Sequence, residues 1–323
     1  MISPLTAREI ELWNAYFEYY TTECRKAVET DHGQHVTVRT HEDVITISRH
    51  FKEGLTKDTI KRSLTLLDTR NRTEEVKDRM AEGSVRLAVR LFSMVDVGPT
   101  SNNWTWSPPS LPWTDEQLDL SAVLANHFVI STKDTGSLIF EDEFSAFNLQ
   151  RLAGLDIQWT NNLANHLRLI DNDRTLCIFH HATFLQRQNS NLFPPSFIKE
   201  TLRTLDLLFP RGDVDTKRWI ASQQSQDADI TRPDTSLTKR DRVPSADRRA
   251  VSFHYWRDEL LSLKEKFDQP KPTSISQFWY DRRNRSQWYT FWIAVTVLCL
   301  TIFFGLVQSI EGALQVYKAY HPT

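Results

Sequence analysis

The chain has 323 residues and a formal net charge of −2, from 39 basic and 41 acidic side chains. That balance excludes the strongly basic surface that is typical of a nucleic-acid binder. Hydrophobic residues make up 40% of the sequence, which predicts a packed core. Only nine glycines occur, and the sequence contains neither a P-loop nor a dinucleotide-binding glycine motif.

Helical patterns fill the first hundred residues. Thr6 and Glu9 have the spacing of a capping box, in which two side chains satisfy free backbone N–H groups at a helix start. An apolar stripe with helical spacing follows at Ile10, Trp13, Phe17 and Tyr20. The same spacing predicts further helices over residues 44–55, 60–67 and 84–97. We therefore interpret residues 1–100 as a helical N-terminal region.

Strand and helix patterns alternate over residues 101–220. Trp104 and Trp106 stand at alternate positions in a segment rich in Trp and Pro, which suggests a short strand. Thr114 begins a second capping box, which predicts a helix to about residue 128. Further strands are predicted over residues 155–159 and 175–179, and further helices over residues 144–152, 160–170 and 195–209. The region is predicted to be a small α+β unit packed with the N-terminal helices, and a winged-helix unit is one form it could take.

Periodicity is lost over residues 221–250. Between Thr231 and Arg249 there are six basic and three acidic side chains with few apolar ones, a composition that predicts a flexible linker. Helical spacing returns at Trp256, Leu260, Leu263 and Phe267. We interpret residues 251–287 as an amphipathic juxtamembrane helix followed by a membrane-entry segment.

An uncharged apolar run over residues 288–310 predicts a transmembrane helix, and residues 311–323 then form a short tail. About 20 apolar residues are enough to cross the hydrocarbon core of roughly 30 Å. The predicted membrane-anchor residues are Trp288, Phe291, Trp292, Ile293, Val295, Leu298, Leu300, Phe303, Phe304, Gly305, Leu306 and Ile310. The predicted fold class is therefore mainly α with a small α+β unit and a single C-terminal transmembrane helix, and the lipid bilayer is the first predicted partner.

Basic residues beside the span predict its orientation. Arg282, Arg283 and Arg285 precede it, against one lysine, Lys318, after it, so the N-terminal domain is expected in the cytosol. No apolar signal segment opens the sequence, so we expect post-translational insertion into an ER-type membrane, as in tail-anchored proteins. Cysteines that are few and widely separated agree with a reducing compartment: Cys24, Cys177 and Cys299.

No pattern of a catalytic or metal site stands out. His180 and His181 are neighbours at a predicted strand, so their side chains are expected on opposite faces, which disfavours a shared metal. Asp171 and Asp173 lack the glycine and glutamate of a calcium loop. No nucleophile elbow occurs, and Cys177 lies inside an apolar run. The sequence predicts no catalytic, cofactor-binding or metal-binding residue, and no cofactor.

Four runs of the sequence resemble an uncharacterised group of filamentous-fungal proteins with a single C-terminal span. These runs are 147–167, 178–185, 200–210 and 287–320. The resemblance is firm over the C-terminal half and loose over the N-terminal half. It implies a fungal, C-terminally anchored membrane protein, and it implies no activity and no catalytic residue.

Two functions remain open. The favoured one is a tail-anchored protein with a cytosolic, non-catalytic interaction domain that acts through protein partners, with self-association through Thr301 and Gly305 as an option. The alternative is a membrane-tethered enzyme whose site is scattered in sequence near His166, Asp171 and His180. A deep pocket converging on these three would favour the enzyme, and burial in satisfied pairs would contradict it. A winged-helix nucleic-acid binder is a third option, which the near-neutral charge disfavours, so no nucleic acid is expected as a partner.

Overall fold

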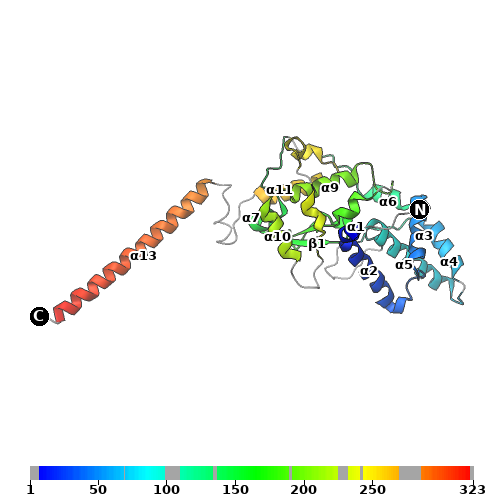
Figure 1. Cartoon of the computed structure of the whole chain (residues 1–323), viewed down its shortest axis with the longest axis horizontal. Helices are drawn as coiled ribbons and strands as arrows, with labels where there is room; N and C mark the ends of the chain where they lie inside the picture. The colour runs from blue at the N-terminus through cyan, green and yellow to red at the C-terminus, as the bar shows by residue number, and fades with distance from the viewer. Residues whose placement is uncertain are drawn as a thin grey trace.

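The computed structural model consists of a folded domain and one long helix that stands apart from it (Figure 1). It describes residues 7–68, 70–98, 110–133, 137–188, 191–224, 232–240, 243–268 and 285–320. Within these ranges the chain is mostly helical and has one three-stranded sheet. The separate helix, α13 (Arg285–Tyr320), is long and apolar enough to cross a membrane. The predicted fold class is confirmed.

Helices around α5 build the N-terminal part of the domain. The elements there are α1 (Ala7–Leu12), α2 (Asn14–Glu29), η1 (Thr30–Gly33), α3 (His41–Lys52), α4 (Lys57–Leu67) and α5 (Glu74–Ser93). Three of them confirm the helices predicted over residues 44–55, 60–67 and 84–97. α5 packs against α2, α3 and α4. At Gly83 of α5, a Cβ would come within 2.0 Å of the His35 carbonyl oxygen, so only glycine allows this close approach.

Side-chain caps determine where two of the helices begin. α3 starts with a capping box, in which Thr40 Oγ1 accepts from the Asp43 N–H and the Asp43 carboxylate accepts from the Thr40 N–H. The helix predicted from Thr114 begins later, at Leu120, because Asp119 caps it. The features predicted at Thr6, Trp104 and Trp106 lie outside the described residues.

The second half of the domain contains the sheet. Its elements are α6 (Leu120–His127), α7 (Ala146–Ala153), β1 (Asp156–Thr160), η2 (Leu163–Asn165), β2 (Leu169–Ile170), β3 (Thr175–Phe179), α8 (Ala182–Gln186), α9 (Phe197–Leu208) and α10 (Val214–Gln224). The middle strand β3 pairs parallel with β1, with Asp156 opposite Thr175, and antiparallel with β2. The two predicted strands are confirmed as β1 and β3. Their parallel pairing differs from the antiparallel hairpin that forms a wing.

The helix predicted over residues 160–170 does not form. The turn η2 and the two-residue strand β2 occupy this segment instead. The Asn162 side chain accepts from the Ala164 N–H and shapes the turn. Leu167 has a φ of 60°, a left-handed conformation that no α-helix contains. Turn chemistry therefore outweighs the helical spacing of the leucines in this segment.

The predicted linker over residues 221–250 is wrong for the parts that the structure describes, 221–224, 232–240 and 243–250. Residues 221–224 end the helix α10, and the other two parts contain the short turns η3 (Thr235–Lys239), η4 (Ser245–Arg248) and η5 (Ala250–Ser252). Leu237 is fully buried, and Asp234 accepts from the Thr183 N–H at 2.8 Å. Short 3-10 turns have no long period to detect, so a few well-placed anchors hold a segment whose composition suggests a linker.

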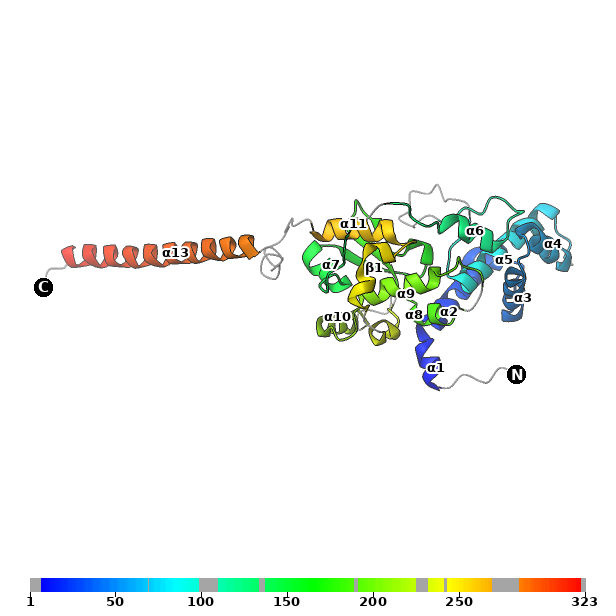
Figure 2. The ribbon, with the colours of Figure 1, turned by 90° about the horizontal axis from the view of Figure 1, so that it is seen from above.

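The helix α11 (Arg257–Asp268) belongs to the domain, whereas the sequence predicts a juxtamembrane helix within residues 251–287. Its apolar stripe is buried at Leu260, Leu263 and Phe267, and it packs against α7. Figure 2 shows α11 and α10 on opposite sides of β1. One hydrophobic core extends from α2 to α11, so the N-terminal helices and the part that contains the sheet share their interior.

Candidate functional site

The most apolar surface of the molecule is on α13. The segment Tyr289–Tyr317 is a candidate membrane span of 29 residues, and its most apolar stretch is not buried against the rest of the structure. At 1.5 Å per residue these 29 residues extend for about 44 Å, more than the roughly 30 Å hydrocarbon core. Ile293, Phe303 and Leu306 are each more than half exposed, as side chains facing lipid would be. Such a surface is stable only when something apolar covers it.

The residues predicted to anchor and orient the span are only partly described. The backbone of Arg285 begins α13, whereas Arg282 and Arg283 lie outside the described residues. The predicted anchor from Trp288 to Ile310 lies wholly within α13. Gly305 has open space around it, since a Cβ placed there would meet no atom within 4 Å.

His180 and His181 lie together, contrary to the prediction that they point to opposite faces. β3 ends at Phe179, so the alternation of a strand no longer applies to the two histidines. Both Nε2 atoms contact Asn161 Oδ1, at 3.1 Å from His180 and 2.7 Å from His181. His180 Nδ1 accepts from the Asp234 N–H, so its ring carries its one proton on Nε2. Burial lowers the pKa of His180 to about 3 and that of His181 well below its ordinary value.

His166 is equally buried and has separate partners. Its Nδ1 accepts from the Phe179 N–H at 3.2 Å, and its Nε2 donates to Thr204 Oγ1 at 2.7 Å. That hydroxyl in turn donates to the Thr201 carbonyl. Burial lowers the pKa of His166 to about 3, so the ring is neutral at physiological pH.

The three side chains of the predicted scattered site do not share a centre. His166 and His180 each use both ring nitrogens in hydrogen bonds, while Asp171 lies in an exposed turn and accepts from the Thr175 hydroxyl. Among the described residues, no group of three or more His, Cys, Asp or Glu side chains could hold a metal ion. These histidines therefore hold the fold together, in the satisfied arrangement that argues against catalysis by them.

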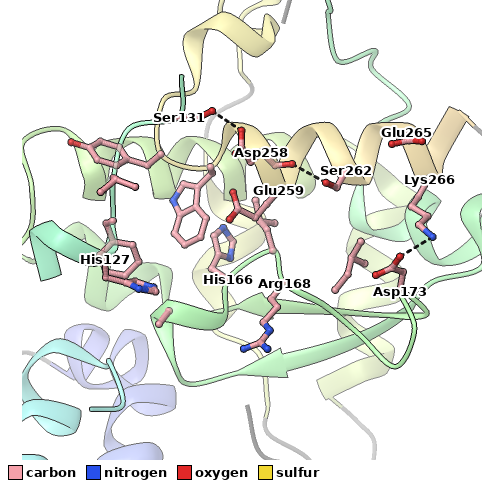
Figure 3. A pocket seen from close by; sticks show the side chains of 17 residues that line it. His127, Ser131, His166, Arg168, Asp173, Asp258, Glu259, Ser262, Glu265 and Lys266 are labelled. Atoms are coloured by element: carbon pink, nitrogen blue, oxygen red, sulfur yellow. Dashed lines mark hydrogen bonds and ion pairs between the residues drawn. The ribbon is translucent and has the colours of Figure 1, made fainter. Parts of the chain in front are cut away.

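A cavity of about 800 Å³ lies between α11 and the chain from η2 to β2, and we call it the α11 cavity (Figure 3). Its walls are partly aromatic and aliphatic, from Phe128, Tyr255, Trp256 and Leu167. The charged side chains that line it are Arg168, Asp173, Asp258, Glu259, Glu265 and Lys266. The volume falls within the range of small-molecule sites in proteins, about 300–1,000 Å³.

Two of the acidic groups in the α11 cavity already have cationic partners. Lys266 Nζ lies 3.1 Å from the Asp173 carboxylate, and Lys133 Nζ lies 3.1 Å from that of Asp258. Asp258 also accepts from the Ser131 hydroxyl at 2.5 Å. Hydrogen bonds and the Lys133 charge hold the pKa of Asp258 below its ordinary value, against the effect of burial.

Glu259 differs from these two groups. Its Oε2 atom is buried and has no hydrogen-bond partner among the described residues, and burial raises the pKa of its carboxyl group. Arg168 also lines the cavity, but its guanidinium reaches only Asn165 Oδ1, at 3.4 Å, and makes no ion pair within the described residues. In Figure 3 the Arg168 guanidinium points away from the Glu259 carboxylate. A buried oxygen without a partner costs free energy, so Glu259 requires an explanation.

Glu259 is the residue that the sequence-based prediction missed. It follows Trp256 by three positions and precedes Leu263 by four, so it lies on the apolar face of α11. An acidic residue on the buried face of an amphipathic helix is the signal that could have identified it. Comparison with known proteins transfers no function to this site, because no family model, curated protein or solved structure matches the chain.

Proposed function

We propose that this protein is a single-span membrane protein whose folded domain is held at the membrane by α13 and acts by binding protein partners, without catalysis. The observation that carries the proposal is the 29-residue apolar segment Tyr289–Tyr317, which stands apart from the domain core. A helix of a soluble core buries its apolar side chains, and this one does not. A lipid bilayer offers such a helix an apolar environment, which supports the proposal.

The non-catalytic part of the proposal is supported by the state of the buried polar groups. His166 and His180 are neutral, and both nitrogens of each ring are occupied by hydrogen bonds. A general base needs a free nitrogen within reach of a substrate, and neither ring offers one. The predicted enzyme around His166, Asp171 and His180 therefore loses its catalytic groups.

The finer parts of the proposal are a cytosolic domain, tail-anchored insertion and an ER-type membrane. The cytosolic orientation is supported by the basic residues that precede the span, at positions 282, 283 and 285. Membership of the fungal single-span group belongs to the same proposal and adds no activity to it. Self-association through the open face at Gly305 is also part of it.

Membrane anchoring is tested by placing charge in the span. The variant with Leu298→Arg and Phe303→Arg puts two cations near the helix centre, at about 3 kcal/mol each. We expect the full chain to resist carbonate extraction from membranes and the variant to become soluble. A matched control replaces Leu66 and Leu67, two exposed leucines of α4, by Arg and stays in the membrane. Extraction of the native chain by carbonate would contradict the proposal.

Orientation is tested with glycosylation acceptors. The native triplet at Asn71 is exposed on the domain and is expected to stay unmodified, while an acceptor added after Thr323 is expected to gain a glycan. Microsomes added after translation has stopped distinguish post-translational from co-translational insertion. A glycan on Asn71 would reverse the proposed orientation.

A further inference from the structure

We propose that the α11 cavity binds an organic cation, an ammonium group on a small apolar body, with the Glu259 carboxylate as its counter-ion. The proposal is independent of membrane anchoring. It starts from the buried Glu259 Oε2 atom, which has no partner, although the two neighbouring acids, Asp173 and Asp258, are paired. A ligand whose positive charge lies in the cavity beside the Glu259 carboxylate would stabilise its ionised form.

The charge of the cavity favours a cation over an anion. Four acidic side chains line it against two basic ones, and its histidines His127 and His166 have pKa values lowered by burial. Arg168, which makes no ion pair within the described part of the chain, points away from Glu259 (Figure 3). An anion beside Glu259 would meet an unpaired like charge in a partly apolar space.

The walls of the cavity favour a ligand with an apolar or quaternary ammonium centre. Phe128 and Trp256 pack with ring centroids 6.0 Å apart, and the His166 ring meets Trp256 edge-on at 4.8 Å. Aromatic rings attract cations through the negative potential of their faces. The acidic side chains of the cavity do not converge into a group that could hold a bare metal ion among the described residues, and the volume of about 800 Å³ has room for an organic body.

Hydrogen bonds hold the aromatic wall of the cavity and the first turn of α11 in place. Trp256 is held by its own hydrogen bond, since its Nε1 donates to Thr201 Oγ1 at 2.8 Å. The Glu200 carboxylate accepts from the N–H groups of Tyr255 and Trp256 and fixes the start of α11. Glu259 is thus presented from a helix whose first turn is anchored, which limits the entropy lost when a ligand binds.

The test uses the full chain in neutral detergent micelles and three probes of similar size: benzyltrimethylammonium, benzyl alcohol and phenylacetate. Titration calorimetry is expected to show binding of the cation at a single site, at least tenfold tighter than that of the other two probes. Glu259→Gln is expected to weaken the cation at least tenfold. Asp268→Asn removes the same charge from α11 outside the cavity lining and is expected to change affinity less than twofold.

Two further measurements keep the test independent of folding. Phe128→Leu is expected to weaken benzyltrimethylammonium more than benzyl alcohol, because a cation gains more than a neutral ligand from an aromatic ring in the cavity wall. Since burial raises the pKa of Glu259, cation binding near that pKa should release a proton, seen as a binding enthalpy that changes with the buffer. The proposal is overturned by unchanged cation affinity in a folded Glu259→Gln variant, by preference for phenylacetate, or by binding of none of the probes.

Discussion

Two polar regions of the same domain differ in how their buried groups are satisfied. At the end of β3, the carboxylate of Asp234 accepts from Thr183 and Ser236, while Asn161 accepts from two histidines. In the α11 cavity, Glu259 keeps a buried oxygen without any partner. In the first region the acceptors Asp234 and Asn161 meet their donors, and the buried atoms without a partner among the described residues, His181 Nδ1 and Ser236 Oγ, belong to neutral groups. In the second region the buried atom without a partner is a carboxylate oxygen. That difference separates a structural polar group from one that is free to recognise a ligand.

The largest expected effect is acid unfolding caused by the buried histidines His166, His180 and His181. Their pKa values lie near 6.5 in the unfolded chain, and those of His166 and His180 fall to about 3 in the folded one. Between these values the unfolded chain binds more protons, so stability is full above pH 6.5 and falls as the pH drops towards 3. Each histidine contributes a slope of about 1.4 kcal/mol per pH unit. Urea unfolding followed from pH 7.5 to 4.5 measures it, and a flat profile would contradict the proposed neutral rings.

The second effect is the loss of the buried acceptor Asp234. Asp234→Ala leaves the Thr183 N–H and the Ser236 N–H without a partner, and we expect a loss of about 3 kcal/mol in the free energy of unfolding. Asp247→Ala, in the same segment, removes a carboxylate that is not deeply buried and is expected to cost less than about 0.5 kcal/mol. Equal costs for the two variants would restore the interpretation of this segment as a linker.

A smaller loss is expected at Asn161. Asn161→Ala removes the acceptor shared by His180 and His181, and leaves two buried N–H donors unsatisfied. We expect a cost of about 2 kcal/mol in chemical denaturation at pH 7.5. Without this acceptor no hydrogen bond holds the proton on Nε2 of either ring. NMR of the two imidazoles should therefore show exchange between tautomers. Sharp, unchanged imidazole signals would argue against the shared acceptor.

The smallest effect is expected at Glu259, and its sign is opposite. The folded chain raises the pKa of Glu259, so its contribution to stability is present below the unfolded value of 4.5 and is lost as the pH rises through the folded value. At neutral pH, Glu259→Gln should therefore keep or slightly raise the unfolding temperature of the ligand-free protein. A marked loss of stability would mean that Glu259 is a structural group like Asp234.

Sequence patterns predicted the elements that carry a helical, an alternating or a continuous apolar signal. The leucines and phenylalanine of α11, the alternation of β1 and the uncharged run of α13 all belong to this class. The patterns failed where single polar contacts decide the structure. Asn162 and a left-handed Leu167 replace a predicted helix by a turn, and Asp234 holds a segment that resembles a linker.

The candidate site was harder to predict than the fold. Adjacent histidines such as His180 and His181 are typical of metal or catalytic sites, yet both rings hydrogen-bond to the Asn161 side chain. Glu259 carries no motif, and its importance comes from what surrounds it in three dimensions. Unmet hydrogen bonding is a property of packing, so composition and spacing cannot show it.

The burial of α11 in the core has a consequence for the order of synthesis. The domain cannot complete its interior until Leu263 and Phe267 have been made, and only 20 residues separate Asp268 from Tyr289, where the apolar segment starts. At about 5–20 residues per second, the ribosome adds those residues in about 1–4 s. The helix α11, which completes the core, and the first apolar turn of α13 are thus synthesised within seconds of each other. Any factor that shielded α13 from water would therefore meet a chain whose domain has only just closed.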